Sequence, residues 1–149
     1  MVRQMHLMNI KPVSRKLITF DFDGTLEDEF DDTFNSQKEE IQNICKQLIE
    51  MGNDVRILTK RYSSDFSSLG KGNEHVIVYE LASKLGIPPS KVHFTNRQMK
   101  FGFINENNVD IHFENSQYEV DLIYQSLQGT NRKCVVVPVE DPYWRDLVY

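Results

Sequence analysis

Two acidic residues, Asp21 and Asp23, stand two positions apart where an apolar run ends in the turn-forming pair Gly24-Thr25. In an extended segment, side chains at i and i+2 point the same way, so both carboxylates are expected to face one cavity. Two carboxylates this close repel each other unless a proton or a divalent cation lies between them. Mg²⁺, which favours carboxylate and carbonyl oxygens, is the natural occupant. The alternative is a structural turn in which Asp23 only caps the backbone.

The elements that position this pair alternate between strand and helix. Apolar runs bounded by turn residues predict strands over 16–22, 54–59, 92–95, 109–113 and 134–138. Apolar residues at helical spacing predict a helix that follows a cap at Asn35 or Ser36, helices over 74–85 and 100–106, and a helix capped by Ser116. A Ser- and Gly-rich loop is expected over 61–72.

Strands that are separated by helices imply parallel pairing with right-handed crossovers. The expected fold is therefore α/β: a three-layer α/β/α sandwich with a mainly parallel, Rossmann-like sheet, built by one domain over residues 1–149. In such sheets the functional site lies at the carboxyl ends of the strands. This edge is expected to hold residues 21–25, Thr59, Thr95, Glu114 and Asn115.

Composition and charge exclude several classes of protein. The hydrophobic share of 40% and the charged share of 26% are ordinary for a globular domain and exclude a disordered or collagen-like chain. A net charge of −5 argues against broad non-specific binding to nucleic acid. The two cysteines, Cys45 and Cys134, are expected to be buried thiols. No apolar stretch reaches the roughly 20 residues of a membrane helix, and residues 1–14 lack a signal-peptide core, so a cytoplasmic location is expected.

The run Phe20-Asp-Phe-Asp-Gly-Thr-Leu26 resembles the first motif of the haloacid dehalogenase (HAD) superfamily, Asp-x-Asp-x-Thr after a hydrophobic strand. Thr59 ends a predicted strand, as the Ser/Thr of the superfamily's second motif does. Lys100 matches the third-motif lysine in a layout similar to that of class B acid phosphatases and other small HAD phosphatases. Lys60 is the competing candidate, but it directly follows Thr59. The resemblance covers residues 16 to about 128.

The fourth motif departs from the family pattern. Asn115 stands where the family normally has an aspartate that ligates the metal, so it offers a carbonyl oxygen without charge. Glu114 supplies a charge nearby and is the alternative metal ligand. Glu119, one helical turn further on, is the next candidate.

The resemblance implies a Mg²⁺-dependent phosphatase, that is, a phosphoric monoester hydrolase that works through an aspartyl-phosphate. Asp21 would be the nucleophile, and Asp23 would protonate the leaving group and then deprotonate water. Thr59 and Lys100 would orient and neutralise the phosphoryl oxygens. The Asp21 side chain, the Asp23 backbone carbonyl and either Asn115 or Glu114 would hold Mg²⁺.

The spacing of the motifs predicts a protein without a separate cap domain. About 33 positions separate Leu26 from Thr59, and about 40 separate Thr59 from Lys100, which is too few for an extra domain in either interval. An open site suits a large substrate, a nucleotide or a nucleic-acid end, or a homo-oligomer in which another subunit covers the site. Four cationic residues are expected to rim the site and attract a phosphorylated substrate: Lys60, Arg61, Lys71 and Arg97.

A second hypothesis comes from a different functional class. A HAD-fold chain that lost efficient metal binding through Asn115 would be a catalytically weak or inactive binding or regulatory module. The intact pair of Asp21 and Asp23 favours the enzyme, whereas Asn115 favours the module.

Overall fold

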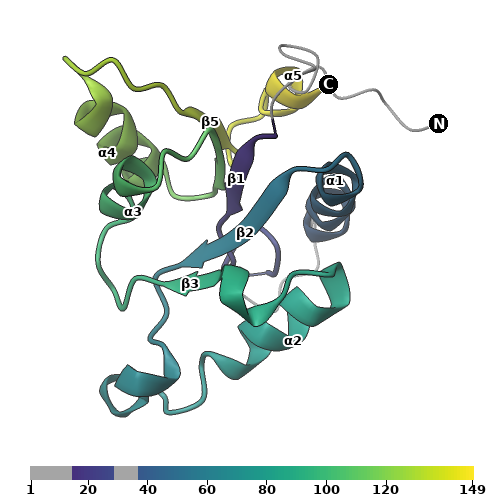
Figure 1. The fold of residues 1–149 in the computed structure, drawn as a ribbon, viewed down its shortest axis with the longest axis vertical. Coiled ribbons are helices and arrows are strands. Elements are labelled where there is room, and N and C mark those ends of the chain that lie inside the picture. The colour runs from purple at the N-terminus through teal and green to yellow at the C-terminus, as the bar shows by residue number, and fades with distance from the viewer. Residues whose placement is uncertain (1–14, 29–36) are drawn as a thin grey trace.

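The computed structural model of the protein describes residues 15–28 and 37–149. Figure 1 shows how strands and helices follow one another along the chain. The strands are β1 (Leu17–Phe20), β2 (Asp54–Thr59), β3 (Val92–Phe94), β4 (Ile111–Glu114) and β5 (Val135–Pro138). The helices are α1 (Lys38–Glu50), α2 (Val76–Leu85), α3 (Phe101–Glu106), α4 (Gln117–Leu127) and α5 (Arg145–Val148), with 3₁₀ turns η2 (Ser64–Leu69) and η3 (Pro89–Lys91).

The five strands form one parallel sheet in the order β3-β2-β1-β4-β5. Helices α1 and α2 cover one face of this sheet, and α3 and α4 cover the other (Figure 1). This arrangement confirms the α/β sandwich with a parallel, Rossmann-like sheet that the alternating pattern predicts. Within the described ranges, no helix combines the length and the apolar character that crossing a membrane would require.

Two apolar cores, one on each face of the sheet, hold the layers together. Ile18 and Phe20 of β1 pack toward α1 and α2, and the Phe20 ring stacks on Phe113 with 4.3 Å between ring centroids. Leu58 and Val136 belong to the second core, under α3 and α4. Burial of this apolar surface on both faces is the main favourable contribution to folding.

The apolar pattern also accounts for most of the element boundaries. Ser116 caps α4 as predicted, because its hydroxyl accepts a hydrogen bond from the backbone N–H of Glu119 at 3.3 Å. The predicted cap of α1 at Asn35 or Ser36 lies outside the described residues. The loop expected over 61–72 contains η2, and α5 was not predicted from the sequence. Trp144, just before α5, is fully buried and explains why the tail folds back onto the core.

Strand β1 ends earlier than the apolar run that predicts it. The run extends to Phe22, but β1 ends at Phe20. The carbonyl of Phe22 accepts hydrogen bonds from the backbone N–H groups of Thr25, Leu26 and Glu27, which pull the chain into a tight turn. Asp21 and Asp23 therefore do not lie on one extended segment.

Both cysteines are buried free thiols, as predicted. Burial raises the pKa of Cys45 and of Cys134 to about 12, so neither thiol ionises near neutral pH.

Candidate functional site

The candidate site lies at the carboxyl ends of β1 and β4, where the strand order of the sheet reverses. From β1 the chain continues to β2 on one side, whereas β4 on the other side follows only after β3. Open α/β sheets bind ligands in the crevice at such a switch point. The crevice is a cavity of about 390 Å³ lined by Asp21, Asp23, Lys60, Lys100, Glu114, Asn115, Ser116 and Glu119.

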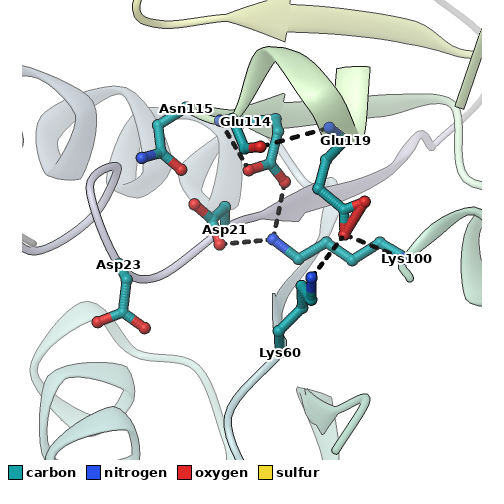
Figure 2. A pocket seen from close by; sticks show the side chains of 8 residues that line it. Asp21, Asp23, Lys60, Lys100, Glu114, Asn115 and Glu119 are labelled. Atoms are coloured by element: carbon teal, nitrogen blue, oxygen red, sulfur yellow. Dashed lines mark hydrogen bonds and ion pairs between the residues drawn. The ribbon is translucent and has the colours of Figure 1, made fainter. Parts of the chain in front are cut away.

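Lys100 links the two strand ends that form this cavity. Its ammonium nitrogen donates to Asp21 Oδ1 at 2.5 Å and to Glu114 Oε1 at 2.7 Å (Figure 2). The side chain is only 2% exposed. Burial opposes the charge of Lys100, but the two carboxylates more than offset this effect and raise its pKa. Lys100 is thus a buried cation shared by two acids.

The carboxyl group of Asp21 is fixed from two sides. Oδ1 accepts from Lys100, and Oδ2 accepts from the Thr25 hydroxyl at 3.1 Å. The backbone N–H of Asp21 donates to the carbonyl of Phe113 at 2.9 Å, which attaches the turn to β4. Burial raises the pKa of Asp21 to about 7, since the opposing effect of Lys100 is the smaller one and the charge of Glu114 adds to the rise. Asp21 is therefore a rigid carboxylate that changes protonation near neutral pH.

Glu114 is anchored by a buried polar chain that the sequence did not reveal. The Nε2 atom of His112 donates to Glu114 Oε1 at 2.9 Å, and the Nδ1 atom accepts from the Thr19 hydroxyl at 2.7 Å. Glu114 Oε2 accepts from the backbone N–H of Ser116 at 3.1 Å. Burial opposes the charge of Glu114, but His112 and Lys100 outweigh it and lower its pKa to about 2. Both carboxylate oxygens are thus used within the protein.

Asn115 packs directly against the turn that carries the acid pair. Gly24 has φ +79°, and a Cβ atom at this position would overlap the Asn115 amide. The amide lies beside the turn that carries Asp21 and Asp23 (Figure 2). Glycine is therefore required at position 24 both for its backbone conformation and for space. This contact brings Asn115 next to the turn that carries Asp21 and Asp23.

Glu119 contributes a buried carboxylate with an unused oxygen. Its Oε1 accepts from the backbone N–H of Lys100 at 3.3 Å and lies 3.9 Å from the ammonium of Lys60. Among the described residues, no group forms a hydrogen bond with Glu119 Oε2. Burial raises the pKa of Glu119. The cavity thus offers an acceptor that a cation or a protonated ligand would satisfy.

The mouth of this cavity contains two side chains with oxygen atoms of the chemical type that a hard divalent cation prefers. The Asp21 carboxylate and the Asn115 side-chain carbonyl are oxygen donors of the kind Mg²⁺ prefers. Within the described ranges, no three His, Cys, Asp or Glu side chains are arranged to hold a metal ion. One physical reason is that Asn115 presents a neutral amide to the cavity and adds no carboxylate beside Asp21. A second is that Lys100 occupies the space between Asp21 and Glu114.

Asp23 lines the cavity, but its carboxylate turns away from Asp21 (Figure 2). Both of its oxygens accept from Arg61, at 2.7 Å from Nη2 and 2.9 Å from Nε. This geometry differs from the shared orientation expected from the i and i+2 spacing, because β1 ends at Phe20. The sequence predicts Arg61 at the rim of the site but indicates no partner for it. Its position two residues after Thr59, at the end of the neighbouring strand, is the signal that links it to Asp23.

The remaining predicted residues lie nearby with different partners. Thr59 ends β2, is buried, and its hydroxyl accepts from the backbone N–H of Arg61 at 3.3 Å. It is not one of the side chains that line the cavity. Of the two candidate lysines, Lys100 contacts Asp21, whereas Lys60 is 34% exposed and lies near Glu119.

Replacing Gly24 tests the close approach of Asn115. Gly24→Ala is expected to lower the free energy of unfolding by about 1–3 kcal/mol more than Gly52→Ala. Gly52 is the matched control, since its φ is +91° and nothing lies within 4 Å of its missing Cβ. Both variants carry the cost of a left-handed alanine, about 1–2 kcal/mol, and only Gly24→Ala displaces Asn115. Urea unfolding at neutral pH measures the difference. Equal losses of unfolding free energy in the two variants would show that the Asn115 contact does not contribute to the cost of Gly24→Ala.

Comparisons with protein families and with curated proteins identified no relative of this chain: no protein-family model matches it, and no curated protein matches it significantly.

Proposed function

We propose that this chain is a Mg²⁺-dependent phosphomonoesterase of the HAD type, with Asp21 as its nucleophile. The observation that carries the proposal is the Asp21 carboxylate, which is 5% exposed, held by Lys100 and Thr25, and directed into a cavity. Burying an acid in this way is costly for the fold, so a functional reason for it is expected. A fixed nucleophile beside a cation is also what phosphoryl transfer requires.

The proposed reaction has two steps, transfer of the phosphoryl group to Asp21 and hydrolysis of the resulting aspartyl-phosphate. A carboxylate oxygen of Asp21 attacks phosphorus, the bond from phosphorus to the ester oxygen breaks, and Asp23 gives a proton to the departing alcohol. Asp23 then takes a proton from water, whose oxygen attacks the aspartyl-phosphate. Inorganic phosphate leaves and the Asp21 carboxylate is restored. Lys100 offsets the charge on the phosphoryl oxygens. The Thr59 hydroxyl is proposed to orient one of these oxygens, which requires it to turn toward the cavity, since it does not line the cavity in this structure.

The residues proposed to hold Mg²⁺ are Asp21, Asn115 and the backbone carbonyl of Asp23. When bound there, the ion supplies positive charge that stabilises the phosphoryl oxygens in the transition state. Glu114 is a weaker candidate, since Lys100, His112 and the Ser116 N–H already occupy its oxygens.

Phosphate release from p-nitrophenyl phosphate tests this function. The full chain is assayed at pH 7 with excess EDTA and then with increasing Mg²⁺, and release is expected only with the metal. A nucleotide and a 3′-phosphorylated oligonucleotide serve as further substrates. Absence of release from every phosphomonoester, or release that does not respond to Mg²⁺, would contradict the proposal.

A binding or regulatory module is the second candidate function. The observation that favours it is the neutral Asn115 beside an Asp21 carboxylate whose charge Lys100 already balances. Such a chain would still bind a phosphorylated ligand, but it would not turn it over. Ligand binding without phosphate release in the assay above is the result that distinguishes the module from the enzyme.

Restoring a charge at position 115 is expected to tighten metal binding. Asn115→Asp adds a negative oxygen next to Asp21, and the Mg²⁺ concentration for half-maximal activity should fall about tenfold, or about 1.4 kcal/mol. Glu114→Gln is the comparison variant and should leave the Mg²⁺ requirement unchanged while lowering stability. If Glu114→Gln weakens the Mg²⁺ dependence and Asn115→Asp changes nothing, Glu114 is the ligand. If neither variant shifts it, Glu119 becomes the candidate.

A further inference from the structure

A second pocket lies beside the candidate active site and shares one wall with it. It has a volume of about 330 Å³ and is lined by Asp23, Arg61, Lys71, Glu74 and Arg97. The two pockets share the residue Asp23, which also lines the larger cavity around Asp21. At about 30 Å³ for each molecule of liquid water, the pocket has room for a phosphate group and part of what carries it. We call it the arginine pocket.

The two neighbouring cavities differ in charge. Four carboxylates and two ammonium groups line the larger cavity, whereas three cationic side chains and two carboxylates line the arginine pocket. The larger cavity therefore suits a cation and the phosphoryl group that binds it. The arginine pocket suits an anion, and guanidinium groups match the geometry of phosphate oxygens.

Arg97 is placed in this pocket by an unfavourable backbone conformation. Asn96 and Arg97 have φ values of 55° and 70°, a left-handed region that side chains with a Cβ rarely adopt. Hydrogen bonds hold the segment there: Asn96 Oδ1 accepts from the Ser63 N–H at 2.8 Å, and the Arg97 N–H donates to the Lys60 carbonyl at 2.7 Å. Backbone strain of this kind is concentrated at functional sites.

The guanidinium group of Arg97 is held ready for a ligand. It lies over the Tyr62 ring at 4.5 Å and donates to Glu74 Oε2 at 2.9 Å. Glu74 is itself buried, and its carboxylate packs closely against Gly70, where a Cβ atom would overlap Glu74 Oε1. Nη1 of Arg97 donates to the Lys60 carbonyl at 3.0 Å, and the side chain nevertheless remains 47% exposed, so solvent and a dissolved anion can reach the guanidinium group.

Arg61 connects the arginine pocket to the chemistry at Asp21. Its Nε and Nη2 atoms bind both oxygens of Asp23, and its Nη1 donates to the Glu74 backbone carbonyl at 2.7 Å. While this pair is intact, Asp23 points away from Asp21 (Figure 2). An acid that protonates a leaving group must turn toward it, so the proposed reaction requires Asp23 to leave Arg61. A phosphate that binds Arg61 in place of Asp23 would release it.

We infer that the arginine pocket is a second anion subsite, which binds a phosphate or phosphodiester group on the leaving-group side of the substrate. This inference rests on the proposed function and specifies its substrate class: phosphomonoesters that carry a second phosphate. The incoming group exchanges places with Asp23 on Arg61 and is also bound by Arg97 and Lys71. Small bisphosphates and 3′-phosphorylated nucleic-acid ends share this chemistry.

Binding to the Asp21→Asn variant tests the subsite without turnover. Isothermal titration calorimetry compares inorganic phosphate, adenosine 3′-monophosphate, adenosine 3′,5′-bisphosphate and a 3′-phosphorylated dinucleotide. The two ligands with a second phosphate group are expected to bind about 10- to 100-fold more tightly than the monophosphate, the range for charge-assisted hydrogen bonds. Whichever of the two binds more tightly identifies the source of the second group.

Three further substitutions decide whether the arginine pocket causes this preference. Adding Arg97→Gln is expected to reduce the preference to less than about threefold. Lys71→Gln, an exposed change that spares the core, is expected to weaken it by a smaller factor. Lys84→Gln is the control, because it removes one charge from the exposed face of α2 and should leave the preference intact. Equal affinity for the mono- and bisphosphates, or a preference that survives both pocket variants, would overturn the inference.

The wild-type chain separates this inference from the proposed function. Lys84→Gln should leave hydrolysis of p-nitrophenyl phosphate unchanged, because Lys84 lines neither pocket. Arg97→Gln should lower hydrolysis of a bisphosphate by a larger factor than hydrolysis of p-nitrophenyl phosphate, since the latter has no second phosphate. If the chain hydrolyses phosphomonoesters without any preference for bisphosphates, the second anion subsite is rejected and the proposed phosphatase activity stands. If the chain hydrolyses none of the substrates but binds bisphosphates more tightly, and Arg97→Gln removes this binding preference, the subsite stands and the phosphatase activity is rejected.

Discussion

Asp21→Asn is expected to abolish phosphate release while the protein stays folded. An amide is no nucleophile toward phosphorus, and it removes the negative charge that attracts the metal. The side chain keeps its size, so its oxygen still accepts from Lys100 and its amide group still meets the Thr25 hydroxyl. Phosphate release with saturating Mg²⁺ measures the effect. Release within a few-fold of the wild type would reject Asp21 as the nucleophile.

The same substitution is expected to stabilise the protein at high pH. Burial raises the pKa of Asp21 to about 7 from its ordinary 3.8, so the folded state binds this proton more tightly than the unfolded chain. The stability that the protonated acid contributes is complete below about pH 4 and is lost as pH rises through 7. Asparagine mimics the protonated acid at every pH. With EDTA present, the variant should therefore gain on the order of 1–3 kcal/mol over the wild type by pH 8.

Asp121→Asn provides the matched control for this pH dependence. Asp121 is an exposed acid on α4 whose carboxylate accepts a hydrogen bond from Gln117 at 2.9 Å. Its replacement should leave activity unchanged and alter stability by less than about 0.5 kcal/mol between pH 5 and 8. A stability difference of Asp21→Asn that does not grow with pH would show that burial does not raise the pKa of Asp21.

The fold was predictable because its determinants are local. The apolar runs predict the ends of β1 and β2, and the cap residue predicts the start of α4, to within one or two residues of the observed ends. The parallel order then brings Asp21 and Glu114 to one edge of the sheet. Lys100 is assigned to this edge by its resemblance to the third-motif lysine, with Lys60 as the alternative, and it contacts both acids.

The parts that sequence reasoning did not reveal depend on long-range register. Thr19 meets His112 because these two residues pair between β1 and β4, 93 positions apart. The orientation of Asp23 depends on the hydrogen bonds that end β1 at Phe20 and on Arg61, 38 positions away. Such pairings follow from the order and register of the strands, which no single segment of the chain contains.

Lys100→Met is expected to be the most destabilising single substitution at the site. Methionine preserves the length of the side chain but leaves Asp21 and Glu114 buried without their shared cation, at 5% and 1% exposure. Removing one partner from a buried ion pair costs about 3–5 kcal/mol, a large part of the 5–15 kcal/mol that stabilises a typical domain. Urea unfolding at pH 8 measures the loss.

Lys60→Met separates this effect from the loss of any lysine near the cavity. Lys60 is 34% exposed and lies 3.9 Å from Glu119, so its replacement should cost less than about 1 kcal/mol. The penalty in Lys100→Met should shrink as pH falls from 8 to 5, because the carboxylates left without a cation take up protons in the folded state and lose their mutual repulsion. Activity assayed below the unfolding temperature of each variant should fall by roughly 10²-fold or more in Lys100→Met. If Lys60→Met were the damaging change and Lys100→Met were silent, Lys60 would be the lysine that serves the phosphoryl group.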